Sequence, residues 1–263
     1  MDPKKGITTT MTISLAVPTY NSAKFTSKSI AKIIDSDYID EIVISDDFSS
    51  QINFIKMTNQ LKQLEEETGY KKIVYYRNDI NQGPLINKYL AIKRCKNSWV
   101  FLLDSDNAIQ DPAEFTEILQ NLTLEKNTIY CPAVGASNYN FFKDIIDKEN
   151  IGDYIRSKRF KMFLNNGNFF VPRKTYVEIF ENIKERDFNT LSGCKKSMDV
   201  LFFNYHWIKA GGRLKVVEDL KYYHRSRKNG NWITHKEENI KTTKILIEKI
   251  KELKKEVNID YTL

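Results

Sequence analysis

Asp104 and Asp106 are separated by one residue and directly follow the apolar run Phe101-Leu102-Leu103. Residues two apart in a strand point to the same face, so both carboxylates would project together from the end of a buried strand. Two like charges at this spacing need either a cation between them or a turn that exposes them to water. A divalent cation, held by one or two carboxylates and by diphosphate oxygens, is one interpretation. The other is an ordinary polar turn, since Asp-Ser-Asp-Asn is good turn composition.

Short apolar runs alternate with helical patterns around these acids. Predicted strands cover residues 12–17, 41–45, 72–76 and 99–104, and predicted helices cover 22–35, 53–67 and 85–95. This β-α-β rhythm predicts an α/β fold, with a Rossmann-like, mostly parallel sheet that helices cover on both faces. Ligands of such sheets bind at the carboxyl ends of the strands.

A polar cluster follows each predicted strand. The clusters are Pro18-Thr19-Tyr20-Asn21, Asp46-Asp47, Arg77-Asn78 and Asp104-Ser105-Asp106. One crevice at the sheet edge can collect all four of them. The sequence contains no GxGxxG, GxxxxGK[ST] or HExxH pattern, so dinucleotide-binding, P-loop and zincin chemistry have no motif support.

The second half of the chain is less regular. The pattern predicts a strand over 128–134, a helix over 140–148, a helix over 197–212 that ends on glycine, and a strand beginning at 213. Residues 235–257 predict an amphipathic helical tail, whose apolar side would either pack on the domain or lie on an anionic membrane. A polar turn, Asn165-Asn166-Gly167-Asn168, sits between apolar flanks.

Composition limits the class of protein. The 263 residues are 41% hydrophobic and 29% charged, which predicts a folded domain, and no apolar run approaches the length of a membrane helix. The N-terminal segment lacks an apolar signal region, and three scattered cysteines predict reduced thiols, so we expect a cytoplasmic protein.

The formal net charge is +7, and residues 221–263 carry 11 Lys and Arg against 6 Asp and Glu. This excess suits phosphate-bearing ligands, an anionic membrane or nucleic acid, or it is a solvated surface. The sequence carries no RNA-binding or helix-turn-helix signature, so no nucleic-acid partner is expected.

Four segments in order resemble the family 2 glycosyltransferases: AVPTYNSAKFTSKSI, EIVISDDFSS, NQGPLINKYLAIKRCKNSWVFLLDSDN and MDVLFFNYHWIKAGGRLKV. The resemblance covers roughly residues 12–225. It implies a GT-A fold and an inverting enzyme that uses a nucleotide-sugar donor, with UDP the favoured nucleotide, and Mn²⁺ or Mg²⁺.

The resemblance also implies the donor site. The residues expected to bind the nucleotide sugar are Pro18, Thr19, Tyr20, Asn21, Asp47, Asn81, Gly83, Lys88, Asp104, Ser105 and Asp106. Asp106 and Asp104 would hold the metal, and His224 would reach back to the metal or the diphosphate. Lys88 and Tyr89 stand where the family more often has arginine and asparagine. Asp47 has an ordinary alternative role as a turn or helix N-terminal acid, and His224 as a structural histidine.

Inverting transfer needs one carboxylate to take the proton of the acceptor hydroxyl. The Glu-Asp pair of the family appears here as Met198-Asp199, which makes Asp199 the expected general base. A first-turn acid favoured by the helix dipole is the alternative role of Asp199. Asp187, Glu218 and Asp219 are the other candidates for the base.

The sequence thus predicts transfer of a sugar to a hydroxyl of a saccharide or glycan acceptor. Residues 1–107 would form the donor half of one GT-A domain, 108–225 the acceptor half, and 226–263 a C-terminal extension that contacts a membrane or packs on the domain. A catalytically inert nucleotide- or glycan-binding relative is the alternative, favoured by the missing glutamate. A sugar-phosphate nucleotidyltransferase fits less well, because VPTYNSAKF lacks the Gly-rich loop of those enzymes.

Overall fold

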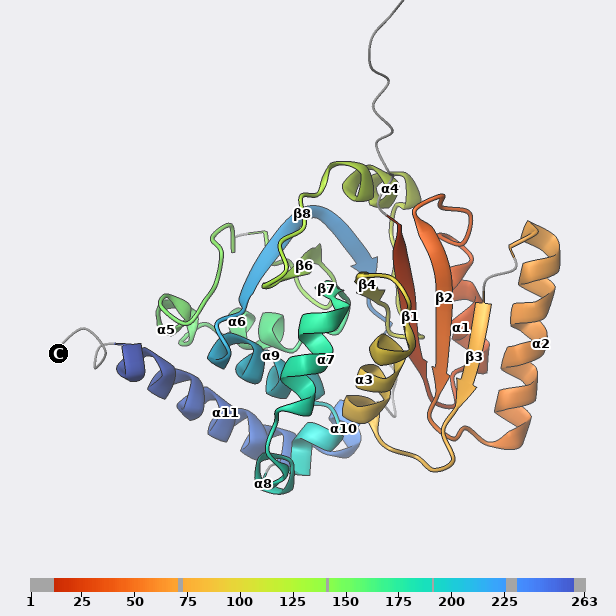
Figure 1. Ribbon diagram of the computed structural model, residues 1–263. Coiled ribbons are helices and arrows are strands. Elements are labelled where there is room, and N and C mark those ends of the chain that lie inside the picture. The colour runs from red at the N-terminus through yellow and green to blue at the C-terminus, as the bar shows by residue number, and fades with distance from the viewer. Residues whose placement is uncertain (1–11, 71–72, 141, 191, 226–230, 258–263) are drawn as a thin grey trace, which may run out of the picture.

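The computed structural model of the protein describes residues 12–70, 73–140, 142–190, 192–225 and 231–257 (Figure 1). The strands are β1 (Ile13–Thr19), β2 (Ile39–Asp46), β3 (Ile73–Arg77), β4 (Trp99–Leu102), β5 (Ala108–Ile109), β6 (Thr128–Val134), β7 (Phe169–Pro172) and β8 (Arg213–Tyr223). The helices are α1 (Ala23–Ile30), α2 (Gln51–Thr68), α3 (Pro84–Arg94), α4 (Pro112–Asn121), α5 (Ile151–Tyr154), α6 (Lys158–Leu164), α7 (Arg173–Glu181), α8 (Glu185–Thr190), η1 (Ser192–Lys195), α9 (Asp199–Lys209), α10 (Asn231–Thr234) and α11 (Lys236–Val257).

All the strands form one sheet, in the order β3-β2-β1-β4-β7-β6-β8-β5. The pairs β2–β3, β1–β2 and β1–β4 are parallel, and β6–β8 is parallel as well. Strand β7 runs antiparallel to both β4 and β6, and so joins the two halves of the chain in one sheet. The carboxyl ends of β1, β2, β3 and β4 therefore meet at one edge, where the predicted site residues lie.

Helices cover both faces of the sheet, as the apolar runs predicted. Leu15 and Val17 pack in a core with α1, α2 and α4, whereas Ala16 between them packs in a second core with α3, α7 and α9. Figure 1 shows α2 on the right of strands β1 to β3, and α3 on their left. Because successive residues of a strand point to opposite faces, a strand buried on both sides is apolar at most positions. The α/β prediction is confirmed.

The C-terminal helix α11 packs on the domain. Its residues Leu246, Ile247, Ile250 and Leu253 are buried in the same core as α9, and α11 lies against α5, α9 and η1. Ile240, which the pattern placed on the apolar side, is 41% exposed instead. The predicted helical tail is confirmed, and its apolar side is covered by protein.

The predicted strands at 12–17, 41–45, 72–76 and 128–134 all appear within a few residues of their expected bounds. The predicted helix at 140–148 is wrong over the part that the structure describes. Ile146 instead exchanges two backbone hydrogen bonds with Leu214, donating at 2.9 Å and accepting at 2.8 Å. The segment around Ile146 is extended and pairs with β8. The bridge to Leu214 satisfies the backbone N–H and C=O groups that a helix would otherwise have satisfied.

His206 on α9 gives the fold a pH dependence. It is buried, and burial lowers its pKa to about 4 from the ordinary 6.5, with Asp187 opposing the shift. The unfolded chain therefore binds a proton at higher pH than the folded chain. Stability is full above about pH 6.5 and is lost as the pH falls toward 4, by about 3 kcal/mol.

We expect His206→Leu to remove this part of the acid sensitivity. The measurement is the urea midpoint of unfolding at pH 7 and at pH 4.5, with His235→Gln as the control because His235 is only partly buried. An equal loss of stability in the wild type and in His206→Leu would contradict the assignment.

Candidate active site

Lys88 lies between two carboxylates from distant parts of the chain. Its Nζ is 3.1 Å from Oδ1 of Asp104, which follows β4, and 2.8 Å from Oδ2 of Asp199, the first residue of α9. The side chains of Lys88 and Asp199 are 11% and 7% exposed, while that of Asp104 is 27% exposed. The structure thus brings the predicted metal-binding acid and the predicted base together at one ammonium.

The charges of this cluster are strongly coupled. Burial disfavours the charge of Lys88, but Asp104 and Asp199 outweigh burial and raise its pKa. Burial raises the pKa of Asp104 despite the attraction of Lys88, and the neighbouring Asp106 and Asp199 raise it further. The Lys88 ammonium faces Asp104 and Asp199, and Asp106 lies close enough to act on Asp104. The negative charge of these acids therefore exceeds the positive charge of Lys88, which favours binding of a further cation.

The loop 165–168 forms the wall of the cluster. The Asp104 amide donates to Oδ1 of Asn168 at 2.8 Å. A Cβ on Gly167 would lie 2.4 Å from Oδ2 of Asp104 and 3.0 Å from Nζ of Lys88. Asn165 accepts from the Leu201 amide at 3.1 Å, and its own amide donates to the Ser197 carbonyl at 2.9 Å. This loop therefore fixes both Asp104 and the start of α9.

The loop 165–168 is visible in the sequence as a polar turn, but its pattern alone does not assign it to the site. The signal was present, since two asparagines, a glycine and a third asparagine interrupt an apolar stretch. Such residues suit a turn that brings backbone close to other groups, and that close approach is what Gly167 provides.

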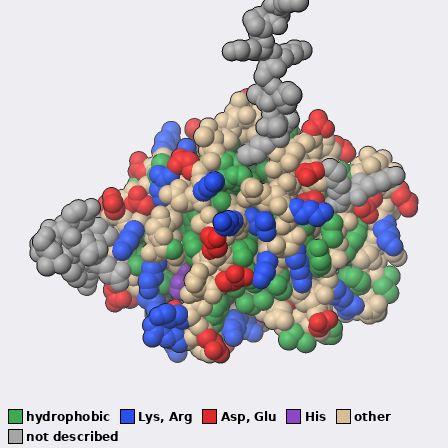
Figure 2. All heavy atoms as spheres, viewed as in Figure 1, with side chains coloured by type: hydrophobic (Ala, Val, Ile, Leu, Met, Phe, Trp, Pro, Cys, Tyr) green, Lys and Arg blue, Asp and Glu red, His purple; other side chains and the backbone are tan. Residues whose placement is uncertain are grey.

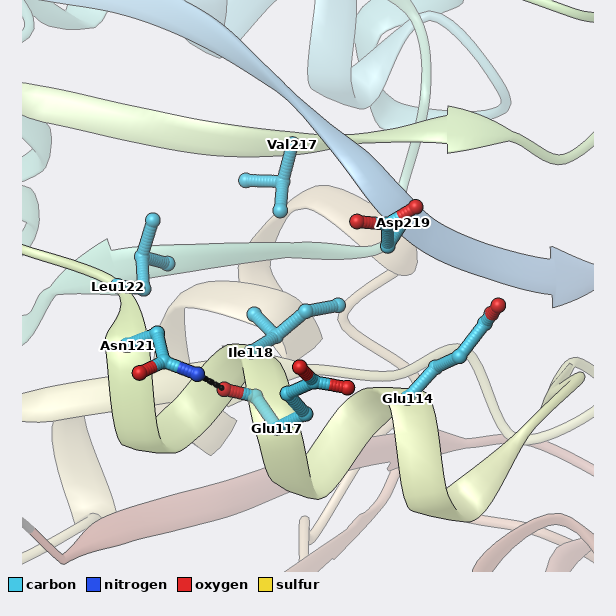
Figure 3. Close-up of a pocket in the computed structure, with 7 residues that line it drawn as sticks. All are labelled: Glu114, Glu117, Ile118, Asn121, Leu122, Val217 and Asp219. Carbon is cyan, nitrogen blue, oxygen red and sulfur yellow. Dashed lines mark hydrogen bonds between the residues drawn. The ribbon is translucent and has the colours of Figure 1, made fainter.

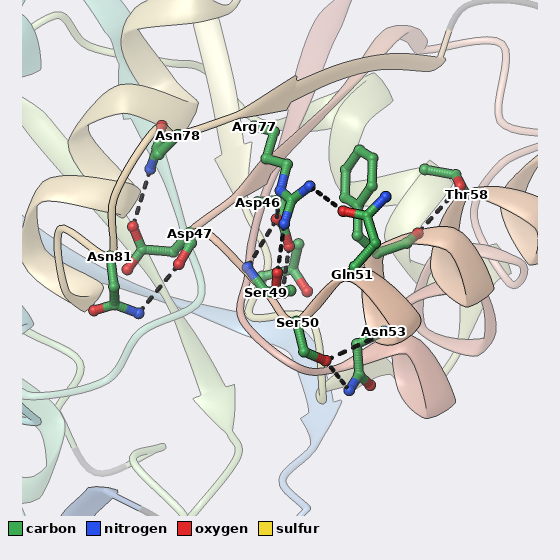
Figure 4. Close-up of polar contacts among 12 residues, drawn as sticks. Asp46, Asp47, Ser49, Ser50, Gln51, Asn53, Thr58, Arg77, Asn78 and Asn81 are labelled. Atoms are coloured by element: carbon green, nitrogen blue, oxygen red, sulfur yellow. Dashed lines mark hydrogen bonds and ion pairs between the residues drawn. The ribbon is translucent and has the colours of Figure 1, made fainter.

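Asp47 holds the loop between β3 and α3 (Figure 4). Its Oδ1 accepts from the Gln82 amide at 2.8 Å and from the Asn78 side chain at 3.0 Å, and its Oδ2 accepts from the Gly83 amide at 2.8 Å. The Asn81 side chain donates to the Asp47 carbonyl at 3.1 Å. Three of the predicted donor-site residues, Asp47, Asn81 and Gly83, are therefore in direct contact.

Gly83 is required at its position for two reasons. Its φ is +82°, a region that favours glycine, and a Cβ there would lie 2.8 Å from the Lys195 carbonyl oxygen. The Gly83 carbonyl also accepts from the Asn87 amide in the first turn of α3 at 3.0 Å. This start of α3 sets the direction of the helix that carries Lys88.

The loops after β1 and β2 are bonded to each other. The Asp47 amide donates to the Thr19 carbonyl at 2.9 Å, the Asn21 amide to Oγ of Ser49 at 2.8 Å, and the Ser50 amide to Oδ1 of Asn21 at 3.0 Å. Asn21 and Phe48 have φ of 48° and 62°, and they are the non-glycine residues with positive φ among those described. Backbone strain of this kind is often stored at binding sites.

Tyr20 and Phe48 are each 49% exposed on these joined loops. The Arg77 guanidinium lies 5.4 Å from the Phe48 ring centre. The sequence does not predict a role for Phe48. Its exposure depends on a backbone conformation with positive φ, which no spacing pattern in the sequence indicates.

The Asp-Ser-Asp segment turns sharply after β4. The Asn107 amide donates to the Asp104 carbonyl at 2.9 Å, and Oγ of Ser29 donates to the Ser105 carbonyl at 2.9 Å. Strand β5 then pairs with the end of β8, with Ala108 opposite Tyr223. The Arg225 amide donates to Oδ1 of Asn107 at 3.3 Å, so the exposed His224 lies one residue from the acidic turn.

The carboxylates at this turn suit a divalent cation whose coordination is completed by the oxygens of a diphosphate. The described residues include no group of three or more His, Cys, Asp and Glu side chains able to hold a metal by themselves. Mg²⁺ and Mn²⁺ are commonly bound through one or two carboxylates plus substrate phosphates, which Asp104 and Asp106 can provide. The residues present therefore fit a metal that arrives with its substrate.

Two of the alternative bases, Asp219 and Asp187, have other surroundings. Asp219 lines a hollow of about 490 Å³ between α4 and β8, together with Glu114, Glu117, Ile118, Asn121, Leu122 and Val217 (Figure 3). None of these seven residues is one of the predicted donor-site residues. Asp187 lies on α8, where it acts on the pKa of His206. Asp199 is thus the candidate base that shares a partner with Asp104.

Comparison with known proteins identifies the family. A family model described as glycosyl transferase family 2 matches residues 14–183, more than half of the chain. The chain belongs to glycosyl transferase family 2. It is 34% identical over 102 residues to the uncharacterized glycosyltransferase MG060 of Mycoplasma genitalium, covering 37% of this chain and 33% of that protein.

Solved structures show the same fold. TarS of S. aureus, residues 1–349, in complex with UDP-GlcNAc is 17% identical with a TM-score of 0.58, covering 84% of this chain and 60% of that one. GalNAc-T7 with UDP, GalNAc and Mn²⁺ is 15% identical with a TM-score of 0.58, covering 85% of this chain and 45% of that one. The chain therefore spans a third of the curated relative and about half of these solved chains, and it has the GT-A fold.

Gly167→Ala should damage the site and spare the fold. The new Cβ would collide with Asp104 Oδ2 and crowd Lys88 Nζ, so this ion pair must rearrange. We expect at least a tenfold loss of nucleotide affinity, about 1.4 kcal/mol, with a nearly unchanged melting temperature. Isothermal titration with UDP and Mn²⁺ measures the first quantity, and thermal unfolding the second.

Gly69→Ala is the matched control. Gly69 has a φ of +71° at the end of α2 with no atom within 4 Å of an added Cβ. Alanine there should lower stability by roughly 1 kcal/mol through backbone strain and leave nucleotide binding intact. If both variants lost stability and neither lost affinity, Gly167 would have no role in the site.

Proposed function

We propose that the protein is an inverting, metal-assisted glycosyltransferase that moves a sugar from a UDP-sugar to a hydroxyl of a saccharide acceptor. The observation that carries the proposal is the convergence of Asp104 and Asp199 on Lys88, at 3.1 and 2.8 Å. A donor-side acid and an acceptor-side acid thereby share one site. Family membership and neighbours crystallised with UDP-GlcNAc or UDP support the donor class.

The donor would lie over the joined loops at the ends of β1 and β2. Pro18, Thr19, Tyr20 and Asn21 would form one wall of the donor site, and Asp47 with Asn81 and Gly83 would form the other. Tyr20 and Phe48 offer exposed rings on which a nucleobase can stack. Asp47 already accepts three hydrogen bonds through its carboxylate, so its first effect is to hold these walls in place.

The diphosphate would lie beside the acidic turn. Asp106 and Asp104 would hold Mn²⁺ or Mg²⁺, and His224 follows β8 next to that turn. When bound, the cation stabilises the negative charge that develops on the departing phosphate oxygen. Ser105 keeps the turn closed through its carbonyl, which accepts from Ser29.

The reaction is a direct displacement at the anomeric carbon. The acceptor oxygen forms a bond to this carbon from one face while the bond to the UDP oxygen breaks on the other, and the electron pair leaves with UDP. The acceptor proton passes to the carboxylate of Asp199. Displacement from the opposite face inverts the configuration of the sugar.

The tail does not favour an anionic membrane as a further partner. The exposed positions of α11 include both lysines and glutamates, among them Lys236, Glu237, Lys241, Lys244, Glu248 and Lys251. Figure 2 likewise shows Lys and Arg side chains interspersed with Asp and Glu on the face in view. Among the described residues, no helix is long and apolar enough to span a membrane.

A catalytically inert relative is the rival function, because Met198 stands where the family has glutamate. The Met198 side chain is buried and points to α11, where Oγ1 of Thr243 donates to its sulfur at 3.0 Å. Asp199 nevertheless keeps its place beside Lys88, so one carboxylate remains for the proton.

Donor binding is tested by thermal shift with UDP, GDP, CDP and dTDP, each with and without Mn²⁺. We expect stabilisation by UDP that needs the metal and is lost in Asp106→Ala, because ligands that bind the folded state raise its stability. Glu117→Gln in the hollow beside α4 is the control and should keep the shift. No shift with any nucleotide would overturn the proposal.

Turnover is tested by UDP release from UDP-sugars in the presence of saccharide acceptors. Asp199→Asn keeps the shape of the side chain and removes the base, so we expect kcat to fall by about 100-fold or more with UDP binding retained. Binding without turnover in the wild type would favour the inert relative. Pyrophosphate release from a nucleoside triphosphate and a sugar phosphate would favour the nucleotidyltransferase.

A further inference from the structure

We propose that Lys88 is a positioning residue that holds the general base, whereas the resemblance assigns it to the nucleotide or phosphate. The inference rests on the proposed function, since it takes Asp199 as the base. A single carboxylate, without the glutamate of the family pair, must then be held ready to take the acceptor proton.

The ammonium selects which oxygen of Asp199 is available. Lys88 Nζ lies 2.8 Å from Oδ2 of Asp199. Among the described residues, the Asp199 carboxylate has no other hydrogen-bond or ion-pair partner. Oδ1 is therefore the oxygen left for the acceptor hydroxyl, and Lys88 fixes the rotation of the carboxylate that presents it.

The ammonium is itself confined. Lys88 lies in the second turn of α3, its side chain is 11% exposed, and its second partner Asp104 is 3.1 Å away. Gly167 closes the remaining side, since even a Cβ there would approach Nζ to 3.0 Å. A lysine held from three sides is a fixed point charge, which pre-organises the carboxylate before substrate arrives.

Lysine rather than arginine suits this place. An ammonium is compact and points its three donors to separate acceptors, whereas a guanidinium is a wide planar fork. Here the ammonium meets one oxygen of Asp104 at 3.1 Å and one oxygen of Asp199 at 2.8 Å, on two separate elements. The departure from the arginine of the family is thus explained by contacts with two acids of this chain.

The test separates positioning from phosphate binding in Lys88→Gln. We expect kcat for transfer to fall by about 100-fold while the KM for the UDP-sugar and the Kd for UDP change less than about threefold. A Kd for UDP that rises about tenfold or more would overturn the inference, because it would place Lys88 on the donor. Lys93→Gln on the same helix is the matched control: Lys93 is half exposed, pairs with Glu181 and should leave transfer unchanged.

A double variant shows whether Lys88 acts through Asp199. In the Asp199→Asn background, Lys88→Gln should cause no further loss of kcat, since a positioning residue has nothing left to position. Multiplied losses in the double variant would overturn the inference. If Asp199→Asn alone kept full transfer, the proposed function would fail at its base, and that result is distinct from either outcome for Lys88.

Lys88→Gln leaves buried carboxylates without their cation and can unfold the protein. Lys88→Arg keeps the charge and guards against this outcome. We expect it to fold, to bind UDP like the wild type and to recover part of the lost kcat. An arginine variant that binds UDP more tightly with unchanged kcat would instead place the side chain on the phosphates and overturn the inference.

Discussion

The buried ion pairs of Lys88 are the interaction on which the rest of the structure depends. Asp104 and Asp199 come from opposite halves of the chain, and neither could stay charged and mostly buried without a cation beside it. The ammonium therefore joins the parallel part of the sheet to helix α9. The contact that stabilises this junction is also the centre of the candidate site, so fold and chemistry depend on the same atoms.

A second polar network holds the opposite wall of the site. Asn87, four residues after Gly83, is buried and accepts from Oγ of Ser45 at 2.7 Å, while its side-chain amide donates to the Ser45 carbonyl at 3.0 Å. Asn78 donates to Oδ1 of both Asp47 and Asn87. Buried networks with satisfied partners are rigid, and here they fix the ends of β2 and β3 against α3. The loops that would contact a nucleobase are thus set by the protein before any ligand binds.

The first four strands and their order in the chain follow from the sequence, because strands buried on both faces are continuous apolar runs. The meeting of Asp47 and Asp104 at one sheet edge also follows, since parallel strands share their carboxyl ends. The partner of Lys88 does not follow, because a long side chain at a helix surface can reach several acceptors and only tertiary packing selects among them. The segment around Ile146 was misread for a related reason: its apolar spacing is compatible with a helix, and the choice depends on the distant Leu214.

The replacement of the family glutamate by Met198 is connected to the C-terminal helix. Met198 lies just before the first turn of α9, and its side chain and that of Asp199 have different partners. Asp199 faces Lys88, and Met198 is turned toward α11, where Thr243 donates to its sulfur. A glutamate at 198 would be buried beside the apolar side of α11, at a position where an unpaired charge is costly. An uncharged methionine therefore suits position 198, where α11 covers the side chain. The loss of the second acid does not by itself argue against catalysis by Asp199.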